Sequence, residues 1–312
     1  MKHVFIVNPA AGKCDRSVQV KDIAEKLFLD RTDDFAVKVS KGPGDCTRLA
    51  REACEEGGEV RLYACGGDGT LNEVINGAAG FANASVTHWP AGSGNDFIKV
   101  FDDPAAFRDL SRLIECEEAQ LDLIECETKD HLCYCLNIVS IGLDARIAAE
   151  MGRYRRLPLV TGNGAYYLSI GTNLCKGIAK PFEIHIGNET LVGDKTLICI
   201  CNGRHYGGSF NPMPHAEPDD GVMDVLVIEK VNLLQVAGII GKYQAGKYRE
   251  FPELIRHYRT DDIRIVTPQE SVVQLDGEAL VTSDITFRIS EKKLRFFYPK
   301  GLTYHAAIPV GV

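Results

Sequence analysis

Residues 1–122 alternate short apolar runs with amphipathic stretches, and this alternation sets the strongest limit on the fold of the chain. Short apolar runs predict buried strands, and apolar residues at helical spacing predict the helices that cover them. The expected strands are 3–7, 35–39, 60–65 and 86–89, and the expected helices are 18–28, 47–56 and 71–79. Alternating strands and helices are typical of a parallel sheet, which binds phosphate groups at the carboxyl ends of its strands.

After residue 122 the pattern changes to a series of β-like segments separated by Asn, Gly, Asp and Pro. Such a series predicts an antiparallel β-sandwich or a barrel-like sheet. The expected strands are 132–138, 182–186, 197–201, 223–228, 263–266, 271–275, 285–289 and 294–298, and helices are expected at 164–174 and 233–248. The chain is therefore predicted to be an α/β protein with a Rossmann-like N-terminal domain at 1–122 and an antiparallel β-sandwich domain at 123–299.

The composition limits the partners and the compartment of the chain. A formal net charge of −8 disfavours nucleic acid, whose binding depends on neutralising many phosphates. The 11 cysteines include no CxxC pair and no zinc-like spacing, which suits a reducing cytoplasm. No apolar run approaches the roughly 20 residues of a membrane span. Arg153, Arg155 and Arg156 form a short basic cluster that either contacts anionic lipid headgroups or lies in a solvated loop.

The strongest local motif is CGGDGTLNE at 65–73, which directly follows an expected strand and opens a helix. Its three glycines allow the backbone to approach a phosphate chain, and a helix N-terminus offers N–H groups to anionic oxygen. Asp68 could then hold Mg²⁺ on a nucleotide. A second interpretation treats Asp68 as a helix cap, and Thr70 with Glu73 as a capping box. The two interpretations are compatible, although capping does not require three glycines.

Two further loops also follow expected strands. The sequence PAGSGNDF at 90–97 offers the Ser93 hydroxyl, two glycines and the Asp96 carboxylate for a phosphate, ribose or metal contact, although a plain turn fits equally well. The sequence NPAAGK at 8–13 resembles a P-loop, but it lacks the first glycine and Cys14 follows Lys13. A Walker-type loop is therefore rejected, and a strand-to-helix connection with a solvated Lys13 remains the alternative.

Two acidic segments lie in the second part of the chain. The sequence EPDDG at 217–221 fits a turn, or a metal site that uses the Asp220 carboxylate and backbone carbonyl groups of neighbours such as Glu217 and Val222. The sequence QLDGE at 274–278 lies between two apolar runs, and its Asp-Gly pair predicts a β-hairpin. Spacing alone gives Glu278 no catalytic role.

Seven segments together resemble the diacylglycerol kinase catalytic family, which includes soluble bacterial lipid kinases and the sphingosine and ceramide kinases. They are NPAAGK, GGDGTLNEV, PAGSGNDF, GLDA at 142–145, CNGRHYGGSF at 201–210, EPDDGVMDV and the late DGE, in the order of the family and over nearly the whole chain. The resemblance implies a nucleotide-binding α/β domain related to that of NAD kinases and a β-sandwich domain, with the active site between them. It also implies that residues 300–312 return to the first domain.

The resemblance further implies a kinase that uses ATP and Mg²⁺ to phosphorylate a lipid hydroxyl, with diacylglycerol as the leading acceptor. Glu278 would act as the general base, and Asp68 and Asp96 would serve the catalytic Mg²⁺. The residues implied to hold a second, structural Mg²⁺ are Glu217, Asp220 and Val222. The implied ATP contacts are Asn8, Pro9, Ala10, Ala11, Gly12, Lys13, Ser40, Gly67, Asp68, Gly69, Thr70, Leu71, Asn72, Glu73 and Ser93.

Several alternatives stay open at this point. A NAD kinase shares the GGDGT segment, a related lipid kinase acts on sphingoid bases or other lipids, and a non-catalytic nucleotide or lipid sensor would use the same fold. Ser-Gly stands in the loop at 90–97 where some soluble diacylglycerol kinases have Thr-Val, which leaves the acceptor lipid open. The enzyme is expected in the cytoplasm, with transient contact to the membrane surface that holds its lipid, and a homodimer is a further alternative.

Overall fold

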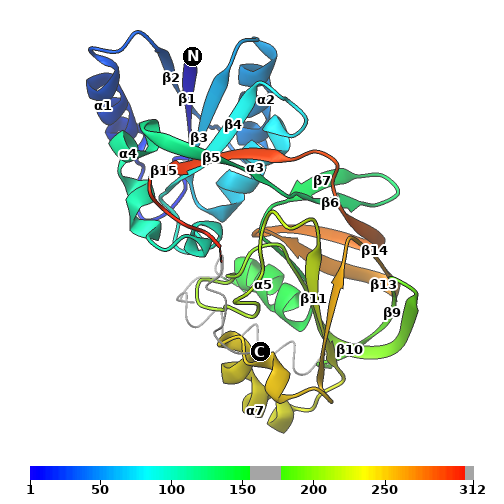
Figure 1. Ribbon diagram of the computed structural model, residues 1–312. Coiled ribbons are helices and arrows are strands. Elements are labelled where there is room, and N and C mark those ends of the chain that lie inside the picture. The colour runs from blue at the N-terminus through cyan, green and yellow to red at the C-terminus, as the bar shows by residue number, and fades with distance from the viewer. Residues whose placement is uncertain (155–176, 306–312) are drawn as a thin grey trace.

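The computed structural model describes residues 1–154 and 177–305, with side chains up to residue 150 in the first range. The expected helix at 164–174 and the side chains of the basic cluster at 153–156 lie outside the described residues. The described chain forms two sheets, one in the upper and one in the lower half of Figure 1.

The first sheet confirms the expected α/β domain. Its strand order is β2-β1-β3-β4-β15-β5, and its first four strands are parallel. They are β1 (Lys2–Val7), β2 (Asp34–Val39), β3 (Val60–Gly66) and β4 (Ala84–Pro90), connected by helices α1 (Ser17–Phe28), α2 (Asp45–Glu55) and α3 (Asp68–Ala78). Apolar residues at helical spacing, such as Val20, Ala24 and Phe28 of α1, bury one face of each helix in the core of this domain.

The chain returns to the first sheet earlier than the sequence predicts. The assignment of 294–298 to the second domain is wrong, because β15 (Leu294–Pro299) lies between β4 and β5 (Cys116–Leu121) in the first sheet. Figure 1 shows β15 in red within that sheet. Phe296 and Phe297 of β15 are fully buried in the first core. An apolar run identifies a strand, but contacts distant in sequence decide which sheet it joins. Short helices η1 (Phe97–Val100), η2 (Pro104–Arg108) and α4 (Leu110–Ile114) link β4 to β5.

The second sheet is antiparallel and folds over on itself. Strands β10 and β13 are long, and each pairs with β8 along one half and with β9 along the other. This double pairing gives the β-sandwich-like shape that the sequence predicts. The strands are β6 (Ile124–Glu127), β7 (Leu132–Cys135), β8 (Ile138–Gly142), β9 (Lys180–Ile186), β10 (Glu189–Cys201), β11 (Met223–Glu229), β12 (Ile255–Thr260), β13 (Asp262–Leu275) and β14 (Glu278–Ile289).

Two details of the second sheet differ from the prediction. The expected strand at 132–138 is divided into β7 and β8, because the backbone N–H groups between them bind the Asp276 carboxylate. The expected strands at 263–266 and 271–275 form the single strand β13, whose register shifts between Val266 and Ser271. Local sequence marks both irregular points, but it does not tell a break in a strand from a bulge.

Two helices cover the outer face of this sheet. Helix α5 (Leu143–Tyr154) follows β8, and helix α7 (Leu233–Gln244) begins at Asn232 with a capping box that includes Gln235. Side chains alternate between the two faces of a strand, so Val139 and Ile141 of β8 enter the inner core, while Ile138 faces an outer apolar cluster that includes residues of α7. Helix η3 (Tyr248–Glu250) leads into β12. Within the described ranges, none of the helices has the length and apolar character of a membrane span.

Candidate active site

The N-terminus of α3 lies at the carboxyl end of β3, and no described side chain caps it. Gly67 is the N-cap residue of this helix. The Glu73 carboxylate accepts hydrogen bonds from the backbone N–H groups of Gly44 (2.9 Å) and Cys46 (3.0 Å), at the start of α2. The capping-box interpretation of Thr70 and Glu73 is therefore wrong. An uncapped helix N-terminus after a glycine-rich turn is a site for anionic oxygen.

Three loops meet at this edge of the first sheet, as their placement after strands predicts. A Cβ atom on Gly92 would lie 2.5 Å from the Cα atom of Gly67, so the loops after β3 and β4 pack backbone to backbone. Gly12, at φ +77°, faces the carbonyl oxygen of Ala91, which would lie 2.2 Å from an added Cβ atom. Only glycine permits this approach. The segments 8–13, 65–73 and 90–97 therefore form one surface.

Asp68 lies beneath this surface, against the loop at 90–97. Its carboxylate accepts hydrogen bonds from the backbone N–H groups of Asn95 (2.7 Å) and Asp96 (2.5 Å), so it does not cap its own helix. Burial, and then the charge of Asp96, raise the pKa of Asp68. His88 lies beside it, and burial lowers the pKa of that imidazole. Two neighbouring carboxylates with hard oxygen atoms fit Mg²⁺, because a bound cation removes the repulsion between them.

Asp96 connects the two domains. Its carboxylate binds the Lys99 ammonium group at 2.5 Å and accepts a hydrogen bond of 3.0 Å from the backbone N–H of Gly208. Lys99 also donates to the carbonyl oxygen of Gly208, at 2.7 Å. Gly208 belongs to the CNGRHYGGSF segment of the second domain. This contact brings that segment against the surface that the three loops form.

The predicted hairpin at Asp276-Gly277 is confirmed. β13 and β14 pair through Leu275 and Glu278, and both turn residues have positive φ, +48° for Asp276 and +94° for Gly277. The Asp276 carboxylate is buried and accepts hydrogen bonds from the N–H groups of Leu136 (2.8 Å) and Ile138 (2.9 Å). Burial raises the pKa of Asp276. These bonds fix the direction in which the hairpin tip points.

The hairpin tip places Glu278 against α3. A Cβ atom on Gly69 would lie 2.8 Å from the Oε1 atom of Glu278, so the glutamate sits directly over the first turn of the helix. Its side chain remains exposed. Partial burial, and then the charge of Glu73, raise the pKa of Glu278. A carboxylate from the second domain thus faces the glycine-rich loop of the first, as the resemblance implies.

The other residues predicted to contact ATP lie around the same surface. The Asn8 amide donates to the Thr70 hydroxyl at 3.0 Å, which ties the first loop to α3. Ser93 and Lys13 are exposed, whereas Ser40 is buried. The side chains of Asn72 and Glu73 bind backbone groups of other elements, including the Tyr134 carbonyl oxygen for Asn72. Their nucleotide contacts, with those of Pro9, Ala10, Ala11, Gly12, Gly67, Gly69 and Leu71, stay predictions.

The carboxylates predicted for a structural Mg²⁺ site have protein partners. Asp220 binds the Arg259 guanidinium group and accepts a hydrogen bond from the Val222 N–H at 3.2 Å. Burial raises the pKa of Asp220. Glu217 binds the Arg204 guanidinium group at 3.1 Å. Both carboxylates are thus already neutralised by cations, and the second Mg²⁺ site stays a prediction.

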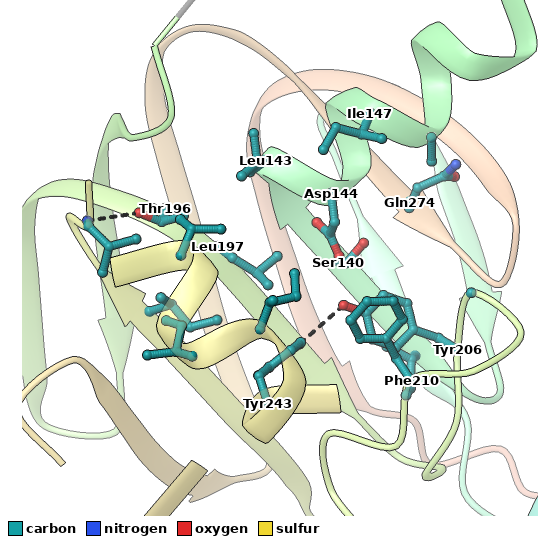
Figure 2. Close-up of a pocket in the computed structure, with 18 of the residues that line it drawn as sticks. Ser140, Leu143, Asp144, Ile147, Thr196, Leu197, Tyr206, Phe210, Tyr243 and Gln274 are labelled. Atoms are coloured by element: carbon teal, nitrogen blue, oxygen red, sulfur yellow. Dashed lines mark hydrogen bonds between the residues drawn. The ribbon is translucent and has the colours of Figure 1, made fainter. Parts of the chain in front are cut away.

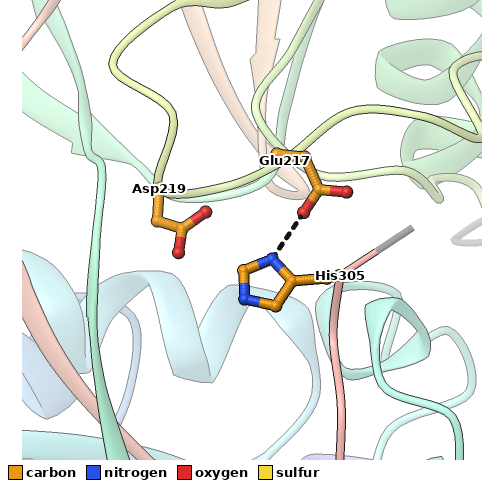
Figure 3. A group of neighbouring side chains, drawn as sticks. All are labelled: Glu217, Asp219 and His305. Carbon is orange, nitrogen blue, oxygen red and sulfur yellow. Dashed lines mark hydrogen bonds and ion pairs between the residues drawn. The ribbon is translucent and has the colours of Figure 1, made fainter. Parts of the chain in front are cut away.

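Glu217 also belongs to a group with Asp219 and His305, whose possible ligand atoms all lie within 4.8 Å of one another. Figure 3 shows the contact between Glu217 and the Nδ1 atom of His305, at 3.1 Å. Asp219 accepts a hydrogen bond from the Tyr304 hydroxyl at 2.8 Å. These bonds attach the segment after β15 to the second domain.

A large apolar cavity lies between the outer face of the second sheet and helices α5 and α7. Its volume is about 570 Å³, and apolar side chains such as Leu143, Ile147, Leu197 and Ile239 form most of its wall. Figure 2 shows these helices facing each other across the cavity, with the Tyr206 and Tyr243 hydroxyl groups in contact at 3.2 Å. Gly277, the residue before Glu278, forms part of the wall. The cavity therefore extends to the hairpin tip.

Two family models match the chain. Residues 2–126 match the model for the diacylglycerol kinase catalytic domain, and residues 137–298 match the YegS C-terminal NAD kinase beta sandwich-like domain. The chain belongs to the diacylglycerol kinase catalytic family. One relative, described as a diacylglycerol kinase of Staphylococcus saprophyticus, is 28% identical over 88% of each chain. Another, described as a probable lipid kinase YegS-like protein of Pseudomonas aeruginosa, is 29% identical over 86% of each chain.

Solved structures of this kinase family share the fold. A diacylglycerol kinase from Bacillus anthracis covers 96% of this chain and 97% of its own, with 21% identity and a TM-score of 0.66. A second structure from the same organism gives a TM-score of 0.73 with 24% identity. Both include the α/β domain and the β-sandwich domain, since they cover nearly the whole chain.

Sequence reasoning missed two features of the site in this family member. The role of Asp276 in fixing the hairpin was not foreseen, because the three N–H groups that it binds are about 140 residues away. The residues that line the cavity could not be assigned from the sequence either, since its wall combines parts of two helices, the sheet and the loop at 206–210. The GLDA segment at 142–145 contains a signal for part of the cavity, since Asp144 interrupts apolar residues at the start of α5. The sequence alone does not indicate the role of this aspartate.

Proposed function

We propose that this lipid kinase transfers the γ-phosphoryl group of ATP to the hydroxyl group of diacylglycerol, giving phosphatidic acid. One observation carries the proposal: Glu278 of the second domain lies over Gly69 of the glycine-rich loop, at the end of an apolar cavity. A phosphate-binding surface, a carboxylate and a space for hydrocarbon then meet at one point. The names of relatives such as the Staphylococcus saprophyticus protein support diacylglycerol as the acceptor.

In this mechanism the lipid hydroxyl oxygen bonds to the γ-phosphorus, and Glu278 accepts the hydroxyl proton. The bond between the γ-phosphorus and the oxygen that bridges to the β-phosphorus breaks, which releases ADP. The N-terminus of α3 and the loops at 8–13 and 90–97 hold the phosphate chain through their backbone N–H groups. Asp68 and Asp96 would hold Mg²⁺, which when bound neutralises phosphate charge.

The apolar wall of the cavity favours a lipid kinase over a NAD kinase. NAD is polar throughout, whereas the cavity wall next to Gly277 is mostly apolar and suits an acyl chain. A purified chain incubated with labelled ATP, Mg²⁺ and mixed micelles should label diacylglycerol more than a sphingoid base. Conversion of NAD to NADP without lipid labelling would favour a NAD kinase. ATP binding with no turnover on any lipid would favour a sensor.

The pH dependence of the reaction follows from the raised pKa of Glu278. A general base must be ionised, so kcat/KM should fall as the pH falls through this pKa, which lies above the ordinary value of about 4.3 for a glutamate. Asp68 also has a raised pKa, and its protonation acts in the same direction because a neutral carboxyl group binds Mg²⁺ poorly. A pH–rate profile at saturating Mg²⁺ measures this fall of kcat/KM at acidic pH. Activity that rises on acidification would contradict both roles.

We also propose that α7 contacts the membrane surface that holds the lipid. Leu233, Leu234 and Ile240 on this helix are 52%, 85% and 46% exposed, and Ile240 also lines the cavity. Replacing Leu234 with Gln should weaken binding to vesicles by about tenfold, because an apolar side chain no longer enters the lipid. Co-sedimentation with diacylglycerol-containing vesicles measures the effect. Val18→Gln, at a 71% exposed position of the first domain, is the matched control, and equal binding by both variants would refute the role of α7.

A further inference from the structure

The apolar cavity contains two buried polar atoms with no hydrogen-bond partner. They are the Oδ2 atom of Asp144 and the Oε1 atom of Gln274, and both residues line the cavity. Asp144 lies in the first turn of α5, whereas Gln274 belongs to β13 and pairs with Ser140 of β8. Figure 2 shows the Asp144 carboxyl group directed from the helix towards Ser140 and Tyr206. Buried polar atoms without partners are rare in folded proteins and indicate a missing ligand or water.

The two oxygens of Asp144 have different surroundings. Oδ1 accepts a hydrogen bond from the backbone N–H of Ala145 at 2.6 Å, whereas Oδ2 has no partner. Among the described residues, no cation forms an ion pair with Asp144, since Arg146 on the same helix donates to backbone carbonyl groups at Gly177 and Ile178. A carboxyl group buried without a counter-ion holds its proton to a higher pH than an exposed one. In the protonated form of Asp144, the partnered Oδ1 is the carbonyl oxygen and Oδ2 carries the hydrogen.

Burial raises the pKa of Asp144 to about 6, although hydrogen-bond donors at Tyr206, Ala145 and Ser140 favour the ionised form and lower this pKa in part. Hydrocarbon that fills the cavity displaces the remaining water and raises this pKa further. An acyl chain in the cavity therefore favours the neutral acid, which donates a hydrogen bond from Oδ2. A carboxylic acid kept neutral by an apolar site acts as a donor in other enzymes.

We propose that Asp144 is a specificity-determining residue that donates a hydrogen bond to an ester carbonyl oxygen of the acceptor lipid. The inference rests on the proposed lipid kinase function and narrows its substrate class to ester-linked glycerolipids. Diacylglycerol has a single donor, the reacting hydroxyl group, while its two ester carbonyl groups need donors. The cavity offers one such donor, the protonated Asp144 carboxyl group, in the same wall as Gly277.

The test compares two lipids with the same chains and the same free hydroxyl group, a diacylglycerol and a dialkylglycerol, whose ether oxygens replace the ester groups. The full-length wild-type chain should show a KM for the diether about tenfold higher than for the diester in mixed micelles, with a similar kcat, because one hydrogen bond is lost. Equal KM values would overturn this inference while leaving the lipid kinase function intact. If neither lipid is phosphorylated, both the proposed function and this inference fail.

Two variants separate donation by Asp144 from a purely structural role. Asp144→Asn keeps an N–H donor and should retain the preference for the diester. Asp144→Leu fills the same space without a donor and should bring the two KM values together. If Asp144→Asn loses the preference as completely as Asp144→Leu, or if the wild-type chain prefers a sphingoid base, whose amine needs an acceptor, the donor role is refuted. If a thermal unfolding assay shows that Asp144→Leu does not fold, the Asp144→Asn variant and the wild-type comparison of the two lipids still test the donor role of Asp144.

Discussion

Replacing Glu278 with Gln should lower kcat for lipid phosphorylation by about 10²–10⁴-fold and leave the KM for ATP nearly unchanged. The amide keeps the size of the side chain and its place over Gly69, but it cannot accept the hydroxyl proton. Glu278 is exposed at the tip of a hairpin, and the core of the second sheet does not depend on its charge. The thermal unfolding temperature of the variant should therefore stay close to that of the wild-type chain.

Steady-state kinetics with labelled ATP in mixed micelles measure this effect. Glu270→Gln is the matched control, because Glu270 is an exposed glutamate of β13, on the same hairpin but away from its tip. It should have wild-type kcat. A Glu278→Gln variant with full activity would show that another group takes the proton, and the raised pKa of Glu278 would then have no bearing on the reaction.

The first domain could be predicted closely from the sequence because its signals are local. The parallel strands β1, β3 and β4 are mostly buried runs that end in glycine-containing loops, so their bounds and the loop positions follow from one short stretch of chain. The same locality allowed the Asp276-Gly277 hairpin to be predicted, since two residues set its geometry. The placement of β15 could not be predicted this way, because its partners β4 and β5 lie about 170 to 210 residues earlier.

In the active site, too, local features could be predicted from the sequence and contacts between distant residues could not. The loops proposed to hold phosphate were predicted from glycine spacing, but the proposed role of Glu278 came only from the resemblance, since an Asp-Gly-Glu turn by itself indicates no more than a hairpin. The structure adds the physical link, which is the contact between the hairpin tip and Gly69. The proposed role of Asp144 needed both the cavity and the unpartnered oxygen, and neither is visible in the sequence.

Replacing Asp68 with Asn should lower kcat by about 10²–10³-fold, because the variant loses the charge that would hold Mg²⁺ at the phosphate chain. Burial, and then the charge of Asp96, raise the pKa of Asp68, while the Lys99 ammonium group pairs with Asp96. Neighbouring carboxylates with a raised pKa are typical of cation-binding and catalytic sites. The variant should also need more Mg²⁺ for half-maximal activity, since Asp96 alone offers a weaker site.

A titration of activity against Mg²⁺ at saturating ATP and lipid measures this shift. Asp109→Asn is the matched control, because the Asp109 carboxylate also accepts a backbone N–H, that of Ser111 at 3.0 Å, but caps α4. That variant should lose a little thermal stability and no activity. If Asp68→Asn and Asp109→Asn have the same Mg²⁺ dependence, the Asp68 carboxylate serves only to hold the loop at 90–97. The catalytic metal would then need other ligands.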